Sequence, residues 1–263
     1  MVYLYQNYKT VYKSKYFTPI KPDNRIILFC FHHAGGSASF FRNWESRLST
    51  SVFNIVPIQL SGREERIKEP FITDMTILVN EIIYDFMPII RKYKYAFLGH
   101  SMGSLIAYEI SYQLEKLSEN KKINLPLFIT LSSVEPPYFP LKMNLNPSES
   151  DEIFLKQLIN YGNIPDAMLD YPEIIGELIK RAKADVILIQ SYTKIFDQEK
   201  RFINKSKLIL FLSNNDKTID IENVFQWENY GIVISKKIFN GTHFYINDNF
   251  LNIIKILEKI NIS

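Results

Sequence analysis

The sequence has little cysteine and no long apolar run, and both absences limit what the protein can be. Cys30 is the single cysteine among 263 residues, so no disulfide can form within the chain, which fits a reducing compartment. No apolar run approaches the roughly 18 residues that a membrane-spanning helix needs. The first residues also lack the apolar stretch of a signal peptide. We therefore expect a cytoplasmic protein with no membrane partner.

An excess of charge of one sign is lacking too. The 31 Lys and Arg residues are interspersed with 28 Asp and Glu residues, which gives a formal net charge of +3. Proteins that bind nucleic acids usually carry a clustered basic face, so we predict no nucleic-acid partner. What the chain does have is 46% hydrophobic residues, enough for a substantial core.

Short apolar segments alternate along the chain with segments of helical length. Most of the apolar segments are almost continuously apolar, which is typical of strands covered on both faces. The alternation predicts an α/β fold with a mainly parallel sheet flanked by helices, in a single domain spanning residues 1–263. The Tyr- and Lys-rich start is interpreted as an arm on the surface of that domain. The expected strands are 25–31, 53–60, 94–99, 126–133, 207–213 and 232–239, and the expected helices lie near 40–49, 74–91, 102–118, 221–229 and 248–260.

One long segment, residues 136–195, interrupts the alternation. It begins with prolines and polar residues, continues with helical patterns and contains no good strand. The simpler interpretation is an elaborated crossover between two strands. We favour a helical lid, because insertions of this kind emerge at the carboxyl ends of strands, where open α/β sheets bind ligands.

The segment "GHSMG", residues 99–103, matches the pattern G-x-S-x-G between an expected strand and an expected helix. In a nucleophile elbow the serine backbone is strained and the chain passes close to itself, so the flanking positions must be nearly without side chains. The alternative is an ordinary strand-to-helix turn. Because the required strand and helix flank the motif, we predict that Ser101 is a catalytic nucleophile.

A serine hydroxyl is a poor nucleophile near neutral pH and needs a positioned base. Of the four histidines, His100 is adjacent to Ser101 and is expected to point elsewhere, and His32 and His33 lie in the loop after the first strand. His243, in "FNGTHF", follows the last expected strand, which is the position of the base in the chain order Ser, Asp, His. We predict His243 as the base.

The base in turn needs an acid that fixes its tautomer and stabilises its charged form. The segment "NNDKTID" offers Asp216 and Asp220 after the strand 207–213. Asp216 follows the strand after two residues, whereas Asp220 precedes a helical pattern and fits an N-cap. We predict Asp216 as the acid and retain Asp220 as the alternative.

An acyl-transfer site also needs two backbone N–H donors for the oxyanion. One is expected from Met102, the residue after the nucleophile. The other is expected from the glycine-rich loop "FHHAGGSASFF", with Ala34 as the first candidate and Gly35 as the second. The alternative for Gly35 and Gly36 is a plain tight turn.

These motifs together resemble a known family. The segments "LFCFHHAGGSASFFRNW", "IQLSGREER", "FLGHSMGSLIAYEI", "LSNND" and "GTHF" occur in the order and spacing of the type II thioesterases. These are stand-alone α/β-hydrolases that accompany nonribosomal peptide and polyketide synthases. The chain departs from the family at His32 and Ser61, where the family usually has proline.

The resemblance implies an α/β-hydrolase fold, a Ser101–His243–Asp216 triad and a helical lid matching 136–195. It implies no bound cofactor. The substrate would be an acyl thioester on the phosphopantetheine arm of a carrier protein, and the role would be to clear stalled or mis-primed carriers. The alternatives are a carboxylesterase or lipase, an acyltransferase, and a non-catalytic binding module on the same scaffold. We expect a monomer.

Two further features are interpreted with the family in mind. Arg63 and Arg66, in "GREER", would contact the pantetheine phosphate or an acidic carrier surface; the alternative is a solvated loop paired with Glu64 and Glu65. The lid aromatics would line an acyl channel, although for any single one packing of the lid on the core is favoured. These aromatics are Tyr138, Phe139, Phe154 and Tyr161.

Overall fold

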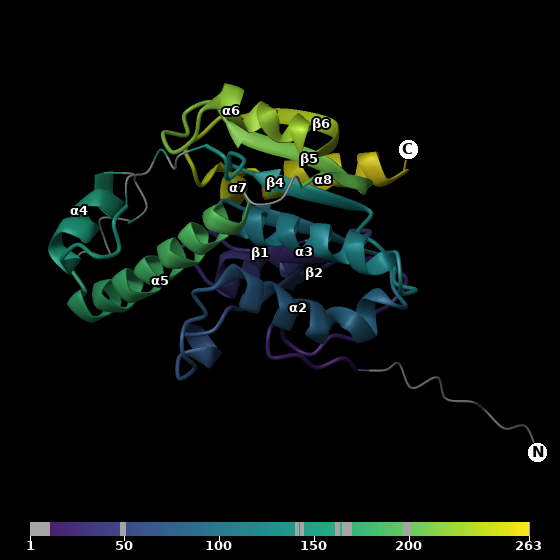
Figure 1. Cartoon of the computed structure of the whole chain (residues 1–263), viewed down its shortest axis with the longest axis horizontal. Helices are drawn as coiled ribbons and strands as arrows, with labels where there is room; N and C mark the ends of the chain where they lie inside the picture. Colours follow the sequence, from purple (N-terminus) through teal and green to yellow (C-terminus); the bar gives the residue numbers. More distant parts are fainter. Residues whose placement is uncertain are drawn as a thin grey trace, which may run out of the picture.

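A six-stranded sheet forms the centre of the protein (Figure 1). The computed structural model describes residues 11–47, 51–139, 142, 145–160, 164, 170–196 and 201–262. All neighbouring strands pair parallel in the order β2-β1-β3-β4-β5-β6, which confirms the predicted fold class. The strands are β1 (Ile26–Phe31), β2 (Phe53–Pro57), β3 (Tyr95–His100), β4 (Phe128–Ser132), β5 (Ile203–Ser213) and β6 (Gly231–Phe239).

Helices cover both faces of the sheet. On one face Phe29 of β1 stacks on Phe86 of α2, with ring centroids 4.3 Å apart. On the other face Trp44 of α1 and Phe250 of α8 pack together, with centroids 5.6 Å apart. Both faces are therefore shielded from solvent, which explains the continuously apolar strands. The helices and 3₁₀ turns are η1 (Ala38–Phe41), α1 (Arg42–Arg47), η2 (Glu64–Arg66), α2 (Met75–Ile90), α3 (Met102–Ser118), α4 (Asp151–Asn160), α5 (Pro172–Phe196), α6 (Ile221–Phe225), η4 (Gln226–Asn229), α7 (Tyr245–Asp248) and α8 (Phe250–Ile262).

Strand β5 begins at Ile203, four residues before the expected start at residue 207. The added residues are mostly polar and carry no apolar signal. Their backbone is held by the carboxylate of Glu115 in α3, which accepts N–H bonds of 2.9 Å from Asn204, Lys205 and Ser206. A side chain 89 to 91 residues away thus supplies acceptors that the sequence pattern did not reveal.

The N-terminal arm is more deeply packed than a surface arm. Within the described part of the arm, Tyr16 and Phe17 are buried in the core beside α2 and β1. The Tyr16 hydroxyl donates to Glu81 of α2 at 2.8 Å, and Tyr12 forms an antiparallel bridge with Ile20. Alternating aromatic and Lys residues gave no helix or strand period from which this burial could be predicted.

The insertion between β4 and β5 consists of α4 and the 25-residue α5 (Figure 1). The N-terminal half of α5 packs with α4 in a small apolar cluster that includes Phe154 and Ile179. Farther along α5, Ile189 and Tyr192 belong to the main core. Of the lid aromatics, Phe154 packs within the insertion, Tyr138 is exposed, and Tyr161 lies outside the described residues. The helix α5 therefore joins the insertion to the body of the protein.

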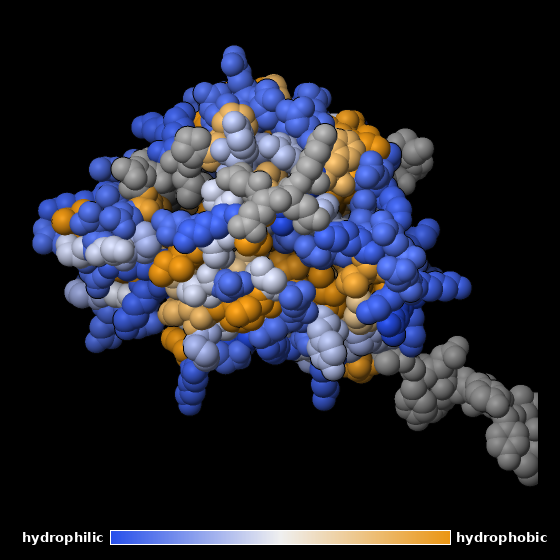
Figure 2. All heavy atoms as spheres, in the orientation of Figure 1, coloured by the Kyte–Doolittle hydropathy of each residue, from blue (hydrophilic) through white to orange (hydrophobic). Residues whose placement is uncertain are grey.

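The outer surface is mixed in character. On the face shown in Figure 2, hydrophilic side chains surround scattered apolar ones. No helix among the described residues is long and apolar enough to cross a membrane. The single-domain boundary at 1–263 stays a prediction.

Candidate active site

Ser101 occupies a sharp turn between β3 and α3. Its backbone angles are φ 54° and ψ −122°, which side-chain-bearing residues rarely adopt. The backbone holds this conformation from both sides: the Ser101 N–H donates to the Ser132 carbonyl at 2.7 Å, and the Ser101 carbonyl accepts from Ser104 N–H at 2.9 Å. This turn lies at the carboxyl edge of the sheet, where Ser101 lines a cavity.

The two glycines of the motif are required by close backbone contacts. A Cβ on Gly99 would lie 2.3 Å from the Ser104 Cα. A Cβ on Gly103 would lie 2.1 Å from the Phe31 carbonyl oxygen. Both distances are far below van der Waals contact, so β1, β3 and α3 can meet at Ser101 only if these positions lack side chains.

We expect Gly103→Ala to destabilise the fold by about 3 kcal/mol or more, because the atoms in contact are backbone atoms that cannot rotate away. The matched control is Gly176→Ala in α5, where an added Cβ meets no atom of the described residues within 4 Å. The control should stabilise by about 0.5–1 kcal/mol through helix propensity. Urea unfolding measures both, and equal midpoints for Gly103→Ala and the wild type would contradict the expectation.

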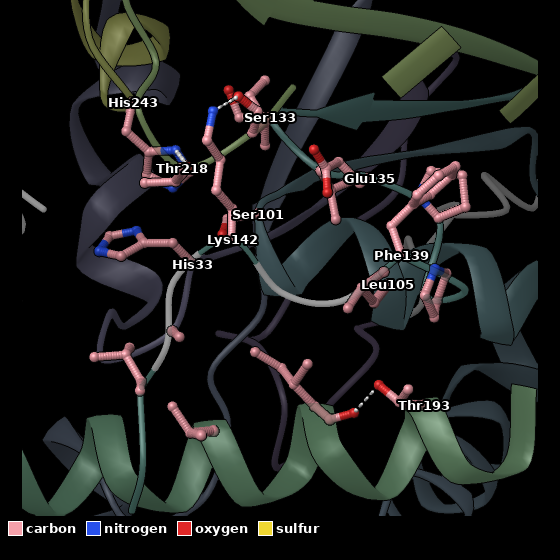
Figure 3. Close-up of a pocket in the computed structure, with 18 of the residues that line it drawn as sticks. His33, Ser101, Leu105, Ser133, Glu135, Phe139, Lys142, Thr193, Thr218 and His243 are labelled. Carbon is pink, nitrogen blue, oxygen red and sulfur yellow. Dashed lines mark hydrogen bonds between the residues drawn. The ribbon is translucent and has the colours of Figure 1, made fainter. Parts of the chain in front are cut away.

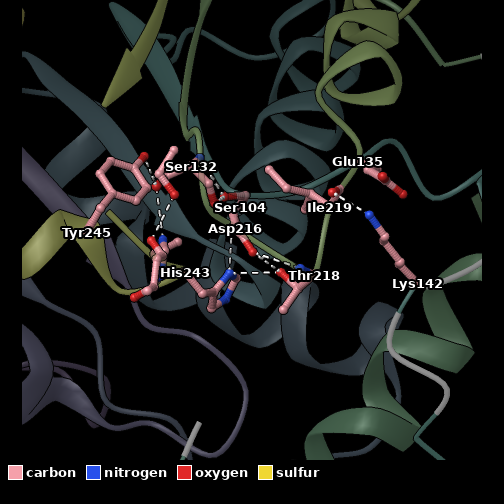
Figure 4. A network of polar contacts seen from close by, with 12 residues as sticks. Ser104, Ser132, Glu135, Lys142, Asp216, Thr218, Ile219, His243 and Tyr245 are labelled. Carbon is pink, nitrogen blue, oxygen red and sulfur yellow. Dashed lines mark hydrogen bonds and ion pairs between the residues drawn. The ribbon is translucent and has the colours of Figure 1, made fainter. Parts of the chain in front are cut away.

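His243 and Asp216 come together at the same edge of the sheet (Figure 4). His243 follows β6 and Asp216 follows β5, and the His243 Nδ1 lies 2.8 Å from the Asp216 Oδ2. The Thr218 hydroxyl completes the arrangement: it donates to Asp216 Oδ1 at 2.6 Å and lies 2.9 Å from His243 Nδ1. Thr218 was not predicted from the sequence, although its place two residues after Asp216 is typical of an Asx-type turn.

The pKa of the Asp216 carboxyl lies below its usual range. Burial alone would raise this pKa, but the hydrogen bonds and charge of His243 and the two hydrogen bonds from Thr218 together outweigh it. The carboxylate is therefore ionised and can stabilise a positive charge on the imidazole.

Asp220 has a different role. Its side chain accepts from the Glu222 N–H at 2.9 Å and caps the N-terminus of α6. This is the capping geometry expected from the sequence, and it directs the Asp220 carboxylate to the helix. The geometry therefore favours Asp216 over Asp220 as the partner of His243.

Of the other three histidines, His32 and His100 are buried and His33 is half-buried, and all three are neutral. Burial lowers the pKa of His32 to about 3 and the pKa values of His33 and His100 well below their usual range. The His100 Nδ1 lies 2.9 Å from the Ser132 hydroxyl, and its ring centroid lies 4.9 Å from that of His243.

The candidate oxyanion donors flank Ser101. Met102 is the first residue of α3, so no carbonyl of its own helix accepts its N–H. Ala34, in the loop after β1, lines the same cavity as Ser101. The Gly35 N–H instead donates to Asp185 at 2.7 Å. Between the two loop candidates, the geometry favours Ala34.

Arg63 and Arg66 do not face solvent, so the predicted contact with a phosphate or a carrier surface does not fit the structure. Arg63 is 2% exposed and forms an ion pair with Asp185 at 2.8 Å. Arg66 is 4% exposed; it pairs with Glu69 and donates to the Gln59 carbonyl. The alternative, a solvated loop paired with Glu64 and Glu65, is also wrong. Sequence spacing pointed to near neighbours, whereas the acid that pairs with Arg63 lies 122 residues away.

Ser101 and His243 line one cavity with a volume of about 870 Å³, including its open mouth (Figure 3). Helix α5 runs along one side of it, with Val186, Ile189 and Thr193 in the lining. Beyond Ser101 the walls are mostly apolar and include Phe139. This lining suits an apolar group next to Ser101.

Comparisons with known proteins agree with this geometry. The family model described as a thioesterase domain matches residues 26–261. The medium-chain S-acyl fatty acid synthase thioesterase of Rattus norvegicus is 30% identical over 255 residues, covering 92% of each chain. The gramicidin S biosynthesis protein GrsT of Aneurinibacillus migulanus is 28% identical over 236 residues, covering 89% of this chain and 88% of that one. The solved structure of YbtT, a type II thioesterase from the yersiniabactin pathway, has the same fold, with a TM-score of 0.78, 19% identity and coverage of 93% and 96%.

Proposed function

The chain belongs to the thioesterase family, and from that premise we propose that it hydrolyses acyl thioesters through an acyl-serine intermediate on Ser101. The observation that carries the proposal is the placement of Ser101 and His243 on one cavity with Asp216 bonded to His243. The three side chains come from three different loops, and their arrangement supports nucleophilic acyl transfer.

The first half of the proposed reaction forms the acyl-enzyme. The Ser101 Oγ attacks the thioester carbonyl carbon while His243 Nε2 takes the hydroxyl proton, since Nδ1 faces Asp216. The backbone N–H groups of Met102 and Ala34 stabilise the oxyanion. The C–S bond then breaks, and His243 returns the proton to the departing thiolate.

The second half releases the acid. His243 takes a proton from water, the resulting nucleophile attacks the acyl-serine carbonyl, and the Ser101 Oγ leaves with the proton that His243 returns. The products are a free carboxylic acid and the thiol. Each proton transfer uses the same imidazole, so one base serves both halves.

For the substrate we propose an acyl group on the phosphopantetheine arm of a carrier protein. The support comes from two relatives, one a fatty acid synthase thioesterase and one a gramicidin S biosynthesis protein. In this role the enzyme is a type II thioesterase that removes stalled or mis-primed acyl groups from synthase carriers. The monomeric state and the cytoplasmic location stay predictions.

Matched substrates test the reaction class. We expect a higher kcat/KM for an acyl-N-acetylcysteamine thioester than for the corresponding ethyl ester, and a still higher value for the acyl-carrier protein, because the carrier adds binding energy remote from the reacting bond. Release of thiol or alcohol measures turnover. Faster turnover of the ethyl ester would indicate an esterase, and transfer of the acyl group to an added alcohol or amine would indicate an acyltransferase.

A further inference from the structure

The buried carboxylate of Asp185 joins three segments that are far apart in the sequence. Asp185 lies on α5 and is 2% exposed. Its Oδ2 accepts the backbone N–H of Gly35 at 2.7 Å and Arg63 Nη1 at 2.9 Å, and its Oδ1 accepts Arg63 Nη2 at 2.8 Å. A bidentate, fully buried pair of this kind holds its groups in one geometry. The lid helix is thereby bonded to the loop after β1 and to the loop after β2.

Arg63 fixes the glycine loop from a second side. Its Nη1 also donates to the Gly36 carbonyl at 3.0 Å, and its Nε donates to the Ser61 carbonyl at 3.2 Å. An added Cβ on Gly35, where φ is 76°, would lie 3.5 Å from the Ala182 Cβ of α5. The backbone of Gly35 and Gly36 therefore rests on α5 and is bonded at both an N–H and a carbonyl group.

These bonds determine the direction of the Ala34 N–H. The Gly36 N–H donates to the His33 carbonyl at 3.1 Å, and the His32 Nδ1 lies 2.8 Å from the same oxygen. In a trans peptide the carbonyl and the N–H point in opposite directions. Because the His33 carbonyl is held by Gly36 and His32, the N–H of the same peptide unit, which belongs to Ala34, points the other way.

We propose that Asp185 and Arg63 are positioning residues for the oxyanion hole. Through them the reaction at Ser101 depends on the position of α5. This inference rests on the proposed function, in which Ala34 donates to the oxyanion. Asp185 is followed on α5 by Val186, which lines the cavity. The acyl group and the glycine loop thus contact the same turn of the lid helix, and displacing that turn releases the Gly35 N–H.

A second buried ion pair provides a matched control. Glu109 of α3 and Arg201 are 3% and 5% exposed and lie 3.1 Å apart. They also hold α5, since Tyr192 donates to Glu109 and Arg201 donates to the carbonyls of Ile195 and Phe196. Both pairs therefore bind α5 to the body of the protein, but of the two, within the described part of the chain, the Asp185 pair alone bonds to the glycine loop.

The test compares Asp185→Asn with Glu109→Gln on an acyl-N-acetylcysteamine substrate. Both variants should unfold at a lower temperature than the wild type. We expect Asp185→Asn to lower kcat by about 10- to 100-fold, with KM changed by less than about threefold, because a shifted oxyanion donor affects the transition state rather than substrate binding. Glu109→Gln should keep kcat within about twofold of the wild type, since it leaves the glycine loop in place.

A trifluoromethyl ketone that adds to Ser101 gives a second measurement, because its adduct carries the oxyanion. Its inhibition constant should weaken in Asp185→Asn in parallel with kcat, and should not change in Glu109→Gln. If Asp185→Asn does not fold, Arg63→Lys replaces it, since lysine keeps the buried charge paired but cannot bond both Asp185 oxygens and the Gly36 carbonyl.

The outcomes separate this inference from the proposed function. Full kcat and unchanged inhibition in the folded Asp185 or Arg63 variant would overturn the positioning role while leaving Ser101 as the nucleophile. Equal losses of kcat in Asp185→Asn and Glu109→Gln would reduce the role of Asp185 to general stability and would also overturn it. If the wild type does not hydrolyse thioesters, or if Ser101→Ala hydrolyses them as fast as the wild type, the proposed function is refuted instead.

Discussion

Ser101→Ala is expected to lower kcat for acyl thioesters by about 10⁶-fold, as removal of the nucleophile does in other serine hydrolases. Without the hydroxyl no acyl-enzyme forms, and only the oxyanion donors and substrate binding remain to assist water. The fold should be kept, because the backbone bonds to Ser132 and Ser104 hold the turn and the Ser101 side chain makes no cap bond to α3. Thiol release measures turnover, and thermal unfolding measures stability.

The control for this variant is Ser111→Ala, a change of the same type within α3, the helix that follows Ser101. The Ser111 hydroxyl is buried and donates to the Ala107 carbonyl at 2.7 Å, one turn back along α3. Its loss should leave kcat unchanged. Near-normal turnover by Ser101→Ala, or labelling of that variant by a fluorophosphonate at the wild-type rate, would show that Ser101 is not the nucleophile.

The sheet could be predicted because burial on both faces imposes a simple pattern. In β1, every side chain from Ile26 to Phe31 is buried, so the strand appears in the sequence as an unbroken apolar run. The edge strand β6 was also found, although residues such as Ile234 and Lys236 are not buried. Its run of β-branched residues, Ile232 to Ile234, was a sufficient signal.

Local rules also predicted much of the candidate site. The need for glycine at Gly99 follows from a backbone contact with Ser104, a few residues away, and the capping role of Asp220 follows from its position before α6. Chain order placed His243 and Asp216 at neighbouring strand ends. Each of these inferences depends on short segments, in which residue type and spacing determine the geometry.

The contacts that join distant segments could not be predicted. Arg63 was expected to face solvent because its sequence neighbours are charged, yet its partner is Asp185 on α5. A signal did exist: Asp185 lies between Ala182 and Ile189 at helical spacing, so a carboxylate occupies the apolar stripe of α5. A buried acid at such a position requires a partner, but the sequence does not identify which one.

The acid of the proposed triad gives the second large effect. Asp216→Asn should lower kcat by about 10⁴-fold, because an amide no longer fixes the His243 tautomer or stabilises its charge. Asp220→Asn is the matched control: Asn caps a helix about as well as Asp, so both kcat and stability should stay near the wild type. If Asp220→Asn loses kcat and Asp216→Asn keeps it, Asp220 is the acid instead of Asp216.

The low pKa of Asp216 makes its contribution to stability depend on pH. In the folded protein its pKa lies below the value of about 3.9 for an unfolded chain, so the unfolded state takes up the proton first as the pH falls. The stability that the ionised Asp216 contributes is therefore fully present above the unfolded pKa of about 3.9 and is lost as the pH falls toward the pKa of the folded protein. Asp216→Asn lacks this contribution, so its difference from the wild type in the free energy of unfolding should shrink below about pH 4. Urea titrations of both proteins from pH 6 to about pH 3 measure that difference, and a constant difference across the range would mean that the carboxylate and His243 are not paired in solution.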